Sequence, residues 1–242
     1  MNYFNYFTEV EDHFVRRRGK HLFVSPLDWS LIATWRDSGV PLHIAMRGID
    51  IAMDSFFSKP NRRGNVNSLF YCHETVMEEF ARHLESHVGE DARPEASADK
   101  SGTRDDDGPD KDMVTKFLAA RISEIKSLHA KLLGQQNTTA LETVERVSAR
   151  LDEIAKDLAE TAHMDLESLD RDLGILDEVL TTELRTAVTP DQMRGWEEEA
   201  KKELKIYRKR LPKETYQKIL ENFLRGKVHR LFDLGELSLF HL

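Results

Sequence analysis

Residues 25–41 have the sequence SPLDWSLIATWRDSGVP, which holds the signals for one helix from its first residue to its last. Ser25 is a good N-cap, and Pro26 fits the first helical position. Asp28 follows the cap by three residues, where its carboxylate completes a capping box. Gly39 is suited to end the helix, because glycine tolerates the backbone conformation of a helix stop. The stretch therefore predicts a capped helix with its own boundaries.

Apolar residues on both sides of this stretch recur every three or four positions, as on one face of a helix. The spacing predicts a helix before it, another that begins at Pro41, and a fourth that begins at Asn67 or Ser68. The residues predicted to point inward are Tyr3, Phe7, Val10 and Phe14; Trp29, Ile32 and Trp35; Leu42, Ala45, Ile49, Ala52, Met53 and Phe56; and Leu69, Val76, Phe80 and Leu84. Residues 1–88 are thus expected to form a compact four-helix bundle.

A change in composition follows. Residues 89–112 contain nine acidic and four basic residues, two prolines, and no Val, Ile, Leu, Met or aromatic residue. Such a segment buries too little apolar surface to offset the entropy of ordering it. It is predicted to be a disordered acidic linker, and it carries a net charge of -5, against -1 for residues 1–88 and -2 for residues 113–242.

The remaining residues, 113–242, are also predicted to be helical, with heptad-like spacing. Thr189 is positioned to cap a helix, and the apolar end of the chain, residues 237–242, is expected to be buried. The apolar series are Leu141, Val144, Val147, Leu151, Ile154, Leu158 and Ala162, and Met193, Trp196, Ala200, Leu204 and Tyr207. The pattern favours an antiparallel helical bundle or a coiled-coil hairpin, so the whole chain is expected to be all-α.

Composition limits the class of protein. The chain has 242 residues, 40% hydrophobic and 32% charged, with a formal net charge of -8, which excludes a collagen, a mucin and a wholly disordered chain. No apolar run approaches the roughly 18 residues of a membrane span, and acidic residues precede the first Lys or Arg, unlike a secretory signal. The single cysteine, Cys72, points to a reducing compartment. We expect a cytoplasmic protein that has no membrane partner.

Two groups of polar residues partly match catalytic or metal-binding patterns. His73 and Glu74 resemble the start of a metalloprotease helix, but Met77 stands where the second histidine is required. His83 and His87 have the i, i+4 spacing of a chelating pair, yet solvent-exposed residues at a helix end are the simpler interpretation. Glycine-rich phosphate loops, nucleophile elbows and dinucleotide fingerprints are not found. We expect no metal site, no cofactor and no catalytic residues, hence a protein that is not an enzyme.

Two clusters of cations lie in the N-terminal half. They consist of Arg16, Arg17, Arg18 and Lys20, and of Lys59, Arg62 and Arg63. Arginine offers a planar fork that matches phosphate oxygens, so the two clusters form a nucleic-acid-binding patch if the fold brings them together. The alternative is that the first cluster stabilises the end of a helix and the second lies in a solvated loop.

Residues 32–80 carry a further pattern: an Ile shortly before a Trp, a Gly, a helix with regularly spaced apolar residues, and a last helix that opens with Ser-Leu and an aromatic. The matching residues are Ile32, Trp35, Gly39, Leu42, Ala45, Ile49, Ser68, Leu69, Phe70 and Tyr71. This pattern resembles the DnaD-like helical domain of bacterial and phage replication-initiation proteins and covers about a fifth of the chain. The resemblance implies a helical domain with a role in DNA replication in bacteria.

Three hypotheses follow for function. The favoured one is a non-enzymatic protein that acts in DNA replication or another nucleic-acid transaction through backbone contacts of the basic clusters. The second is a protein–protein interaction adaptor, in which the heptad faces of residues 113–242 self-associate or receive a partner helix. The third is an enzyme whose site has no familiar pattern.

Overall fold

The computed structural model describes residues 6–19, 24–59, 64–88, 110–133, 138–161 and 165–241. All regular secondary structure in these ranges is helical, which confirms the predicted all-α fold. The chain divides into two compact units. The first comprises Met1–Asp107 together with Leu204–Ile219, and the second comprises Gly108–Glu203 together with Leu220–Leu242. A short segment from the C-terminal half thus belongs to the unit that holds the N-terminal helices.

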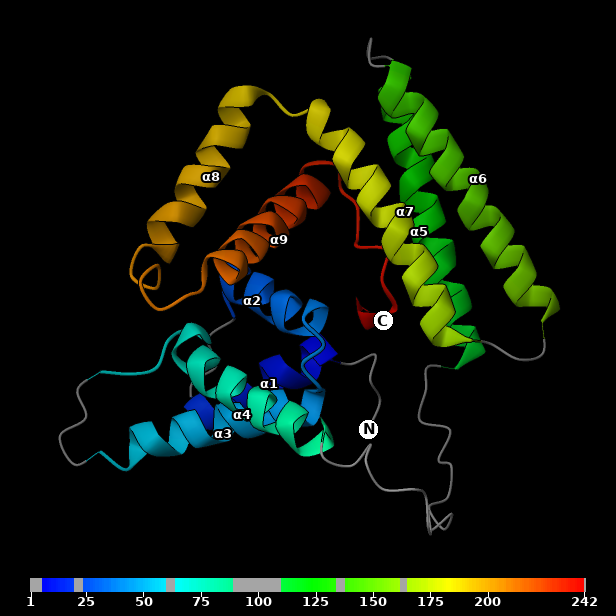
Figure 1. Ribbon diagram of the computed structural model, residues 1–242. Coiled ribbons are helices and arrows are strands. Elements are labelled where there is room, and N and C mark those ends of the chain that lie inside the picture. The colour runs from blue at the N-terminus through cyan, green and yellow to red at the C-terminus, as the bar shows by residue number, and fades with distance from the viewer. Residues whose placement is uncertain are drawn as a thin grey trace. The chain divides into compact units, whose positions relative to one another are not determined.

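The first unit contains α1 (Tyr6–Arg18), α2 (Pro26–Asp37), α3 (Leu42–Phe57) and α4 (Phe70–Val88), which form the predicted bundle (Figure 1). Most of the side chains predicted to point inward are buried there. They include Phe7, Val10, Phe14, Ile32, Trp35, Leu42, Ala45, Ile49, Ala52, Met53, Leu69 and Val76. The prediction for Tyr3 lies outside the described residues.

Helices α3 and α4 are antiparallel neighbours. A Cβ added at Gly48 would lie 2.6 Å from the Val76 Cα, so only glycine allows this close approach of the two backbones. The rings of His43 and His83 meet edge to face, 5.5 Å apart, farther along the same pair. Leu84 therefore lies beside the first turn of α3, at the edge of the bundle. It is 50% exposed, and the prediction that it points inward was wrong.

The predicted capping box is present at the start of α2. The Asp28 amide donates to the Ser25 hydroxyl at 3.1 Å, and the Ser25 amide donates to the Asp28 carboxylate at 3.3 Å. The other carboxylate oxygen of Asp28 accepts from the Ser68 hydroxyl at 2.6 Å and from the Leu69 amide at 2.9 Å. Asp28 is buried. One carboxylate thus ties the start of α2 to the residues that lead into α4.

The second unit begins with α5 (Lys111–Leu132) and α6 (Thr138–Glu160), followed by α7 (Leu166–Thr186) and α8 (Pro190–Leu204) as far as Glu203. It also contains α9 (Lys213–Leu231) from Leu220 onward. Ion pairs between Lys126 and Asp152 and between His129 and Glu145 show that α5 and α6 run antiparallel, which confirms the predicted helical hairpin. The buried heptad residues of α6 are Val144, Val147, Leu151, Ile154 and Leu158. Ala162, at the end of that series, lies outside the described residues.

The predicted linker is shorter at its C-terminal end than expected. Helix α5 starts at Lys111 with Asp110 as its N-cap, so the boundary at Asp112 was wrong. The reason is that an aspartate at a cap and another in the first turn favour a helix start, although they count as linker composition. Residues 89–109 lie outside the described residues.

The apolar end of the chain is buried, as predicted: Leu237, Leu239 and Phe240 are each less than 9% exposed. Carboxylates of α7 hold its backbone. Asp177 accepts from the Leu237 amide at 2.9 Å, and Asp170 accepts from the Leu239 amide at 2.7 Å. None of the helices in the described ranges is both long and apolar enough to cross a membrane.

Candidate functional site

The cations at the end of α1 are largely used by the fold. Arg17 pairs with two acids of α3: its Nε lies 2.9 Å from an Asp50 oxygen, and a terminal nitrogen contacts Asp54. Arg18 is only 8% exposed. Its guanidinium donates to the Asn67 carbonyl at 3.3 Å and lies 5.0 Å from the centre of the Phe14 ring. Two of the predicted phosphate-binding residues therefore have structural partners.

The other predicted site residues fall into two groups. Arg16 and Lys59 are exposed, whereas Lys20, Arg62 and Arg63 lie outside the described residues. The contacts of Arg17 with Asp54 and of Arg18 with Asn67 place the end of α1 beside α3 and beside the residues that lead into α4. Among the described members of the two predicted clusters, only Arg16 and Lys59 are exposed.

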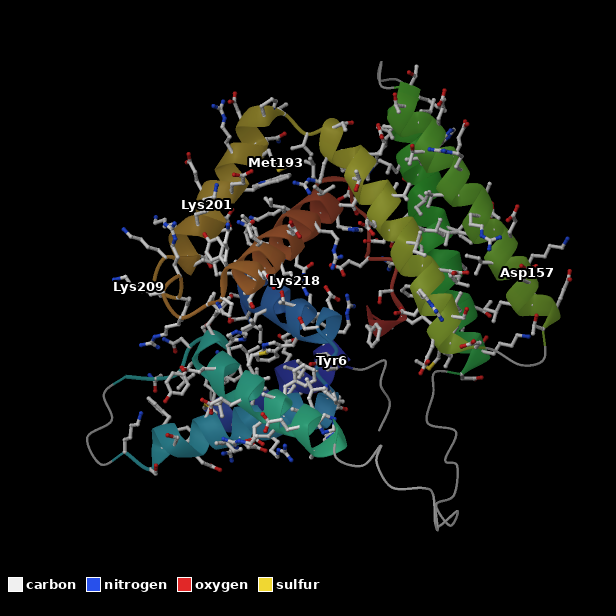
Figure 2. All side chains as sticks on the ribbon, viewed as in Figure 1. Tyr6, Asp157, Met193, Lys201, Lys209 and Lys218 are labelled. Carbon is white, nitrogen blue, oxygen red and sulfur yellow. The ribbon has the colours of Figure 1, made fainter. Side chains whose placement is uncertain are left out.

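A third group of cations, which the sequence analysis did not single out, lies in the first unit. Residues 204–219 contain six Lys and Arg and one Glu. Five of these cations fall within residues 205–213, the connection between α8 and α9, which we call the basic turn. They are Lys205, Arg208, Lys209, Arg210 and Lys213, and all are exposed. Lys209 projects from this connection in Figure 2.

The backbone of the basic turn is ordered by local hydrogen bonds. The amides of Tyr207 and Arg208 both donate to the Leu204 carbonyl at 3.0 Å, and the amides of Arg210 and Leu211 donate to the Tyr207 carbonyl at 2.8 and 3.1 Å. Every third or fourth side chain points inward, since Leu204 and Leu211 are buried. The charged residues between them consequently point outward.

Tyr207 fixes the basic turn to the N-terminal helices. Its ring stacks on that of Phe70, the first residue of α4, with centroids 4.6 Å apart and planes inclined by 20°. Phe70 is 7% exposed, so this contact is part of the core of the first unit. An aromatic stack of this kind stabilises by about 0.5–1.5 kcal/mol beyond the area it buries.

The cations of the basic turn differ from Arg17, Arg47 and Arg82 of the first unit in their partners. None of the five makes an ion pair with any residue that the structure describes. By contrast, Arg47 and Arg82 both contact Glu79, a buried acid of α4. The basic turn thus presents charge that the described part of the protein does not neutralise.

A group of aromatic side chains lies at the same start of α4. The Phe56 ring meets those of Phe57 and Tyr71 edge to face, at centroid distances of 5.5 and 5.7 Å. Phe57 is 42% exposed and Tyr71 is 37% exposed. Because Tyr71 follows Phe70 directly, this ring cluster and the stack that holds the basic turn both use the first turn of α4.

Buried titratable groups of the first unit serve packing. Trp35 Nε1 donates to His73 Nδ1 at 2.9 Å, and burial lowers the pKa of His73 to about 4. Burial, with a smaller contribution from the Asp28 charge, raises the pKa of the Cys72 thiol to about 12. A neutral imidazole and an un-ionised thiol stabilise a core, and neither is poised for nucleophilic chemistry.

A buried polar cluster lies in the described part of the second unit. His229 Nε2 lies 3.1 Å from the Thr181 hydroxyl and 3.3 Å from an Asp177 oxygen. Burial alone would lower the pKa of His229, but the hydrogen bond and charge of Asp177 outweigh burial and raise it. Both contacts use the same ring nitrogen, unlike a catalytic triad, in which the acid and the nucleophile lie on opposite nitrogens. Asp177 also binds the Leu237 amide, so the cluster holds the end of the chain in place.

The described residues include no group of three or more His, Cys, Asp or Glu side chains arranged to hold a metal ion. His83, one of the two histidines considered for chelation, contacts the His43 ring. The side chain of the other, His87, lies outside the described residues.

The basic turn had a signal in the sequence: a count of charges over residues 204–219 shows the excess of cations. The heptad-like series of Met193 to Tyr207 masked it, because that series was interpreted as one helix. The structure ends α8 at Leu204, and Tyr207 points inward from a turn.

A family model described as "Uncharacterised protein" matches residues 5–92, which is less than half of the chain. No curated protein matches the chain. Nor does any solved structure.

Proposed function

We propose that this protein binds the phosphate backbone of nucleic acid through the basic turn, as a non-enzymatic component of DNA replication or another nucleic-acid transaction in the bacterial cytoplasm. The observation that carries the proposal is the set of five exposed cations on an ordered turn, with no acidic partner in the described residues. Arginine and lysine on a fixed scaffold neutralise phosphates and release their counterions, which drives sequence-independent binding.

Charge balance supports a local site. The formal net charge of -8 repels a polyanion at long range, so binding has to come from a patch where cations are concentrated. At physiological salt the repulsion is screened beyond about 8 Å, while contacts at the patch remain. Exposed Arg16 and Lys59, at the end of the bundle where α1 stops, add to the cations available in the first unit.

The resemblance to the DnaD-like domain supports the proposed process more than the proposed contacts. Ile32, Trp35, Ala45, Ile49 and Leu69, which carry much of it, are buried core residues. Core residues specify a fold, whereas function depends on the site. The cations of the basic turn are outside the resemblance, and they provide the contacts.

The test is fluorescence anisotropy with the full-length chain and a labelled 25-base-pair duplex, titrated at 50, 100 and 200 mM salt. We expect micromolar binding at 50 mM and a linear fall of log affinity with log salt, with a slope of about -0.9 for each phosphate neutralised. Changing Arg208, Lys209 and Arg210 together to Ala should flatten the slope by about two to three units. No binding at 50 mM salt would refute the proposal.

A matched control removes the same charge elsewhere. Lys156, Arg171 and Arg185 are exposed cations of α6 and α7, in the second unit. Their joint replacement by Ala also lowers the net charge by three. The control should keep the wild-type slope. If both triple variants weaken binding equally, the effect is one of overall charge and the basic turn is not the site.

The adaptor alternative has one observation in its favour. The heptad residues of α6 are buried within the chain, so they are not offered to a partner. Helix α7, however, exposes Ile175 by 56% and Val179 by 46%, one turn apart. A partner helix docked there would give a concentration-dependent increase in mass that is insensitive to salt and is abolished by changing both residues to Ser. Binding of nucleic acid by the basic turn should instead weaken as the salt concentration rises.

A further inference from the structure

We infer that the nucleic acid held by the basic turn is single-stranded, and that its bases stack on Tyr71 and Phe57. This inference rests on the proposed function and adds the form of the nucleic acid. The geometry that points to it is the first turn of α4, where Phe70 holds the basic turn and the next residue, Tyr71, belongs to a cluster of partly exposed rings.

The link between the two groups runs through consecutive residues. Phe70 holds the basic turn by stacking on Tyr207, and Tyr71, the next residue, contacts Phe56 from the end of α3. Phe56 in turn contacts Phe57. A strand whose phosphates lie on the cations therefore has ring faces within the same region of the surface.

Exposure separates these rings from the core. Tyr71 is 37% exposed and Phe57 is 42% exposed, whereas Trp35 and Phe14 are fully buried in the same unit. Single exposed apolar residues are common on protein surfaces. A pair joined by a shared ring, beside cations without acidic partners, is the combination found where proteins bind single strands.

The form of nucleic acid follows from access to the bases. In a duplex, both faces of each base are covered by its neighbours, so protein rings reach only the backbone and the groove edges. In a single strand the bases can turn outward and stack on aromatic side chains, while the phosphates follow a positive surface. Tyr71 and Phe57 add affinity only in the second case.

The experiment compares four labelled probes with the full-length chain at 50 mM salt: (dT)25, (rU)25, a 25-base-pair duplex, and a 25-mer with the same phosphates and abasic sugars. We expect the tighter of (dT)25 and (rU)25 to bind about tenfold or more tightly than the abasic strand. Tyr71→Ala should weaken that strand about tenfold and leave the abasic strand unchanged. Phe57→Ala should do the same.

Two controls separate stacking from damage to the fold. Tyr71→Phe keeps the ring and should keep wild-type affinity, and Ile51→Ala removes an exposed apolar side chain of α3 and should have no effect. Equal affinity for the base-containing and abasic strands, with the salt slope intact, overturns the inference and leaves backbone binding standing. A tighter duplex also overturns the inference. Absence of binding to every probe overturns the inference and the proposed function together.

Discussion

The end of α1 and the basic turn carry similar runs of charge, Arg16-Arg17-Arg18 and Arg208-Lys209-Arg210, and the fold uses them in opposite ways. In the first run, Arg17 faces acids that lie 33 and 37 residues away in the sequence, and Arg18 is buried. In the second run, no described acid faces the cations. The comparison teaches that a cationic motif acquires its role from the residues that the fold places opposite it.

The largest effect we predict is a loss of stability of the N-terminal bundle at acidic pH, under conditions in which the cations of the basic turn keep their charge. Because burial lowers the pKa of His73 to about 4, the unfolded chain binds this proton first as the pH falls. The stability of the first unit should therefore fall between pH 6.5 and pH 4, by roughly 3 kcal/mol in all. Lysine and arginine stay charged throughout, so binding should be lost only where the bundle unfolds.

Urea unfolding followed by tryptophan fluorescence at pH 7 and pH 5 measures this effect. His73→Gln is the control, since its amide oxygen can still accept from the Trp35 indole while it does not titrate. The variant should lose less stability than wild type on acidification. His229 makes the opposite contribution: its pKa is raised, so its stabilisation is complete below its ordinary pKa and is lost as the pH rises through the folded value. An identical loss of stability in wild type and His73→Gln would contradict the assignment.

The second prediction tests the structural role of the first run directly. Arg18→Ala removes a buried charge that donates to the Asn67 carbonyl and packs on Phe14. It should destabilise the protein by about 2 kcal/mol. Arg16→Ala, next to it but exposed, should change stability by less than about 0.5 kcal/mol. Thermal unfolding by circular dichroism distinguishes the two, and equal effects would break the comparison.

The smallest predicted effect comes from removing the acidic partners of Arg17. Without them, Arg17 would lack an acidic partner among the described residues, as the cations of residues 208–210 do. Asp50→Asn with Asp54→Asn removes the charges that face Arg17, while the amide at position 50 can still form a hydrogen bond with His13 Nε2. The double change should cost no more than about 1 kcal/mol of stability, because both ion pairs of Arg17 are partly exposed. Affinity for the duplex should rise by about two- to threefold, since another cation becomes available to phosphate. An unchanged or weaker affinity would show that Arg17 cannot reach the nucleic acid.

Local signals predicted much of the fold. The capping box at Ser25, the helix stop at Gly39 with its positive φ of 78°, and the inward face of α1 depend on residues close in sequence, and all were predicted. The second role of Asp28, as acceptor for the Leu69 amide 41 residues later, was not predictable. It depends on how the start of α2 packs beside the start of α4, which no local pattern contains.

The candidate site was less predictable for the same physical reason. Sequence alone identified Arg17 and Arg18 as cations, and only the positions of Asp50 and Asn67 show that they are occupied. Residues 204–219 belong to the first unit, and among them Tyr207 stacks on Phe70, which lies on the other side of the acidic linker. Heptad spacing predicted that Tyr207 lies on the apolar face of a helix. It did not predict that the partner of Tyr207 is Phe70.

That stack also fixes the order of events during synthesis. Tyr207 follows Phe70 by 137 residues, so at roughly 5–20 residues per second the ribosome needs about 7–27 s to deliver the partner of Phe70 after α4 has begun to emerge. During that interval Phe70 lacks the ring that stacks on it in the complete chain. A chain that terminates before residue 204 retains α1 to α4 but lacks the segment that covers Phe70 and, with it, the five cations of the basic turn. Completion of the bundle and acquisition of its positive surface are thus a single late step of translation.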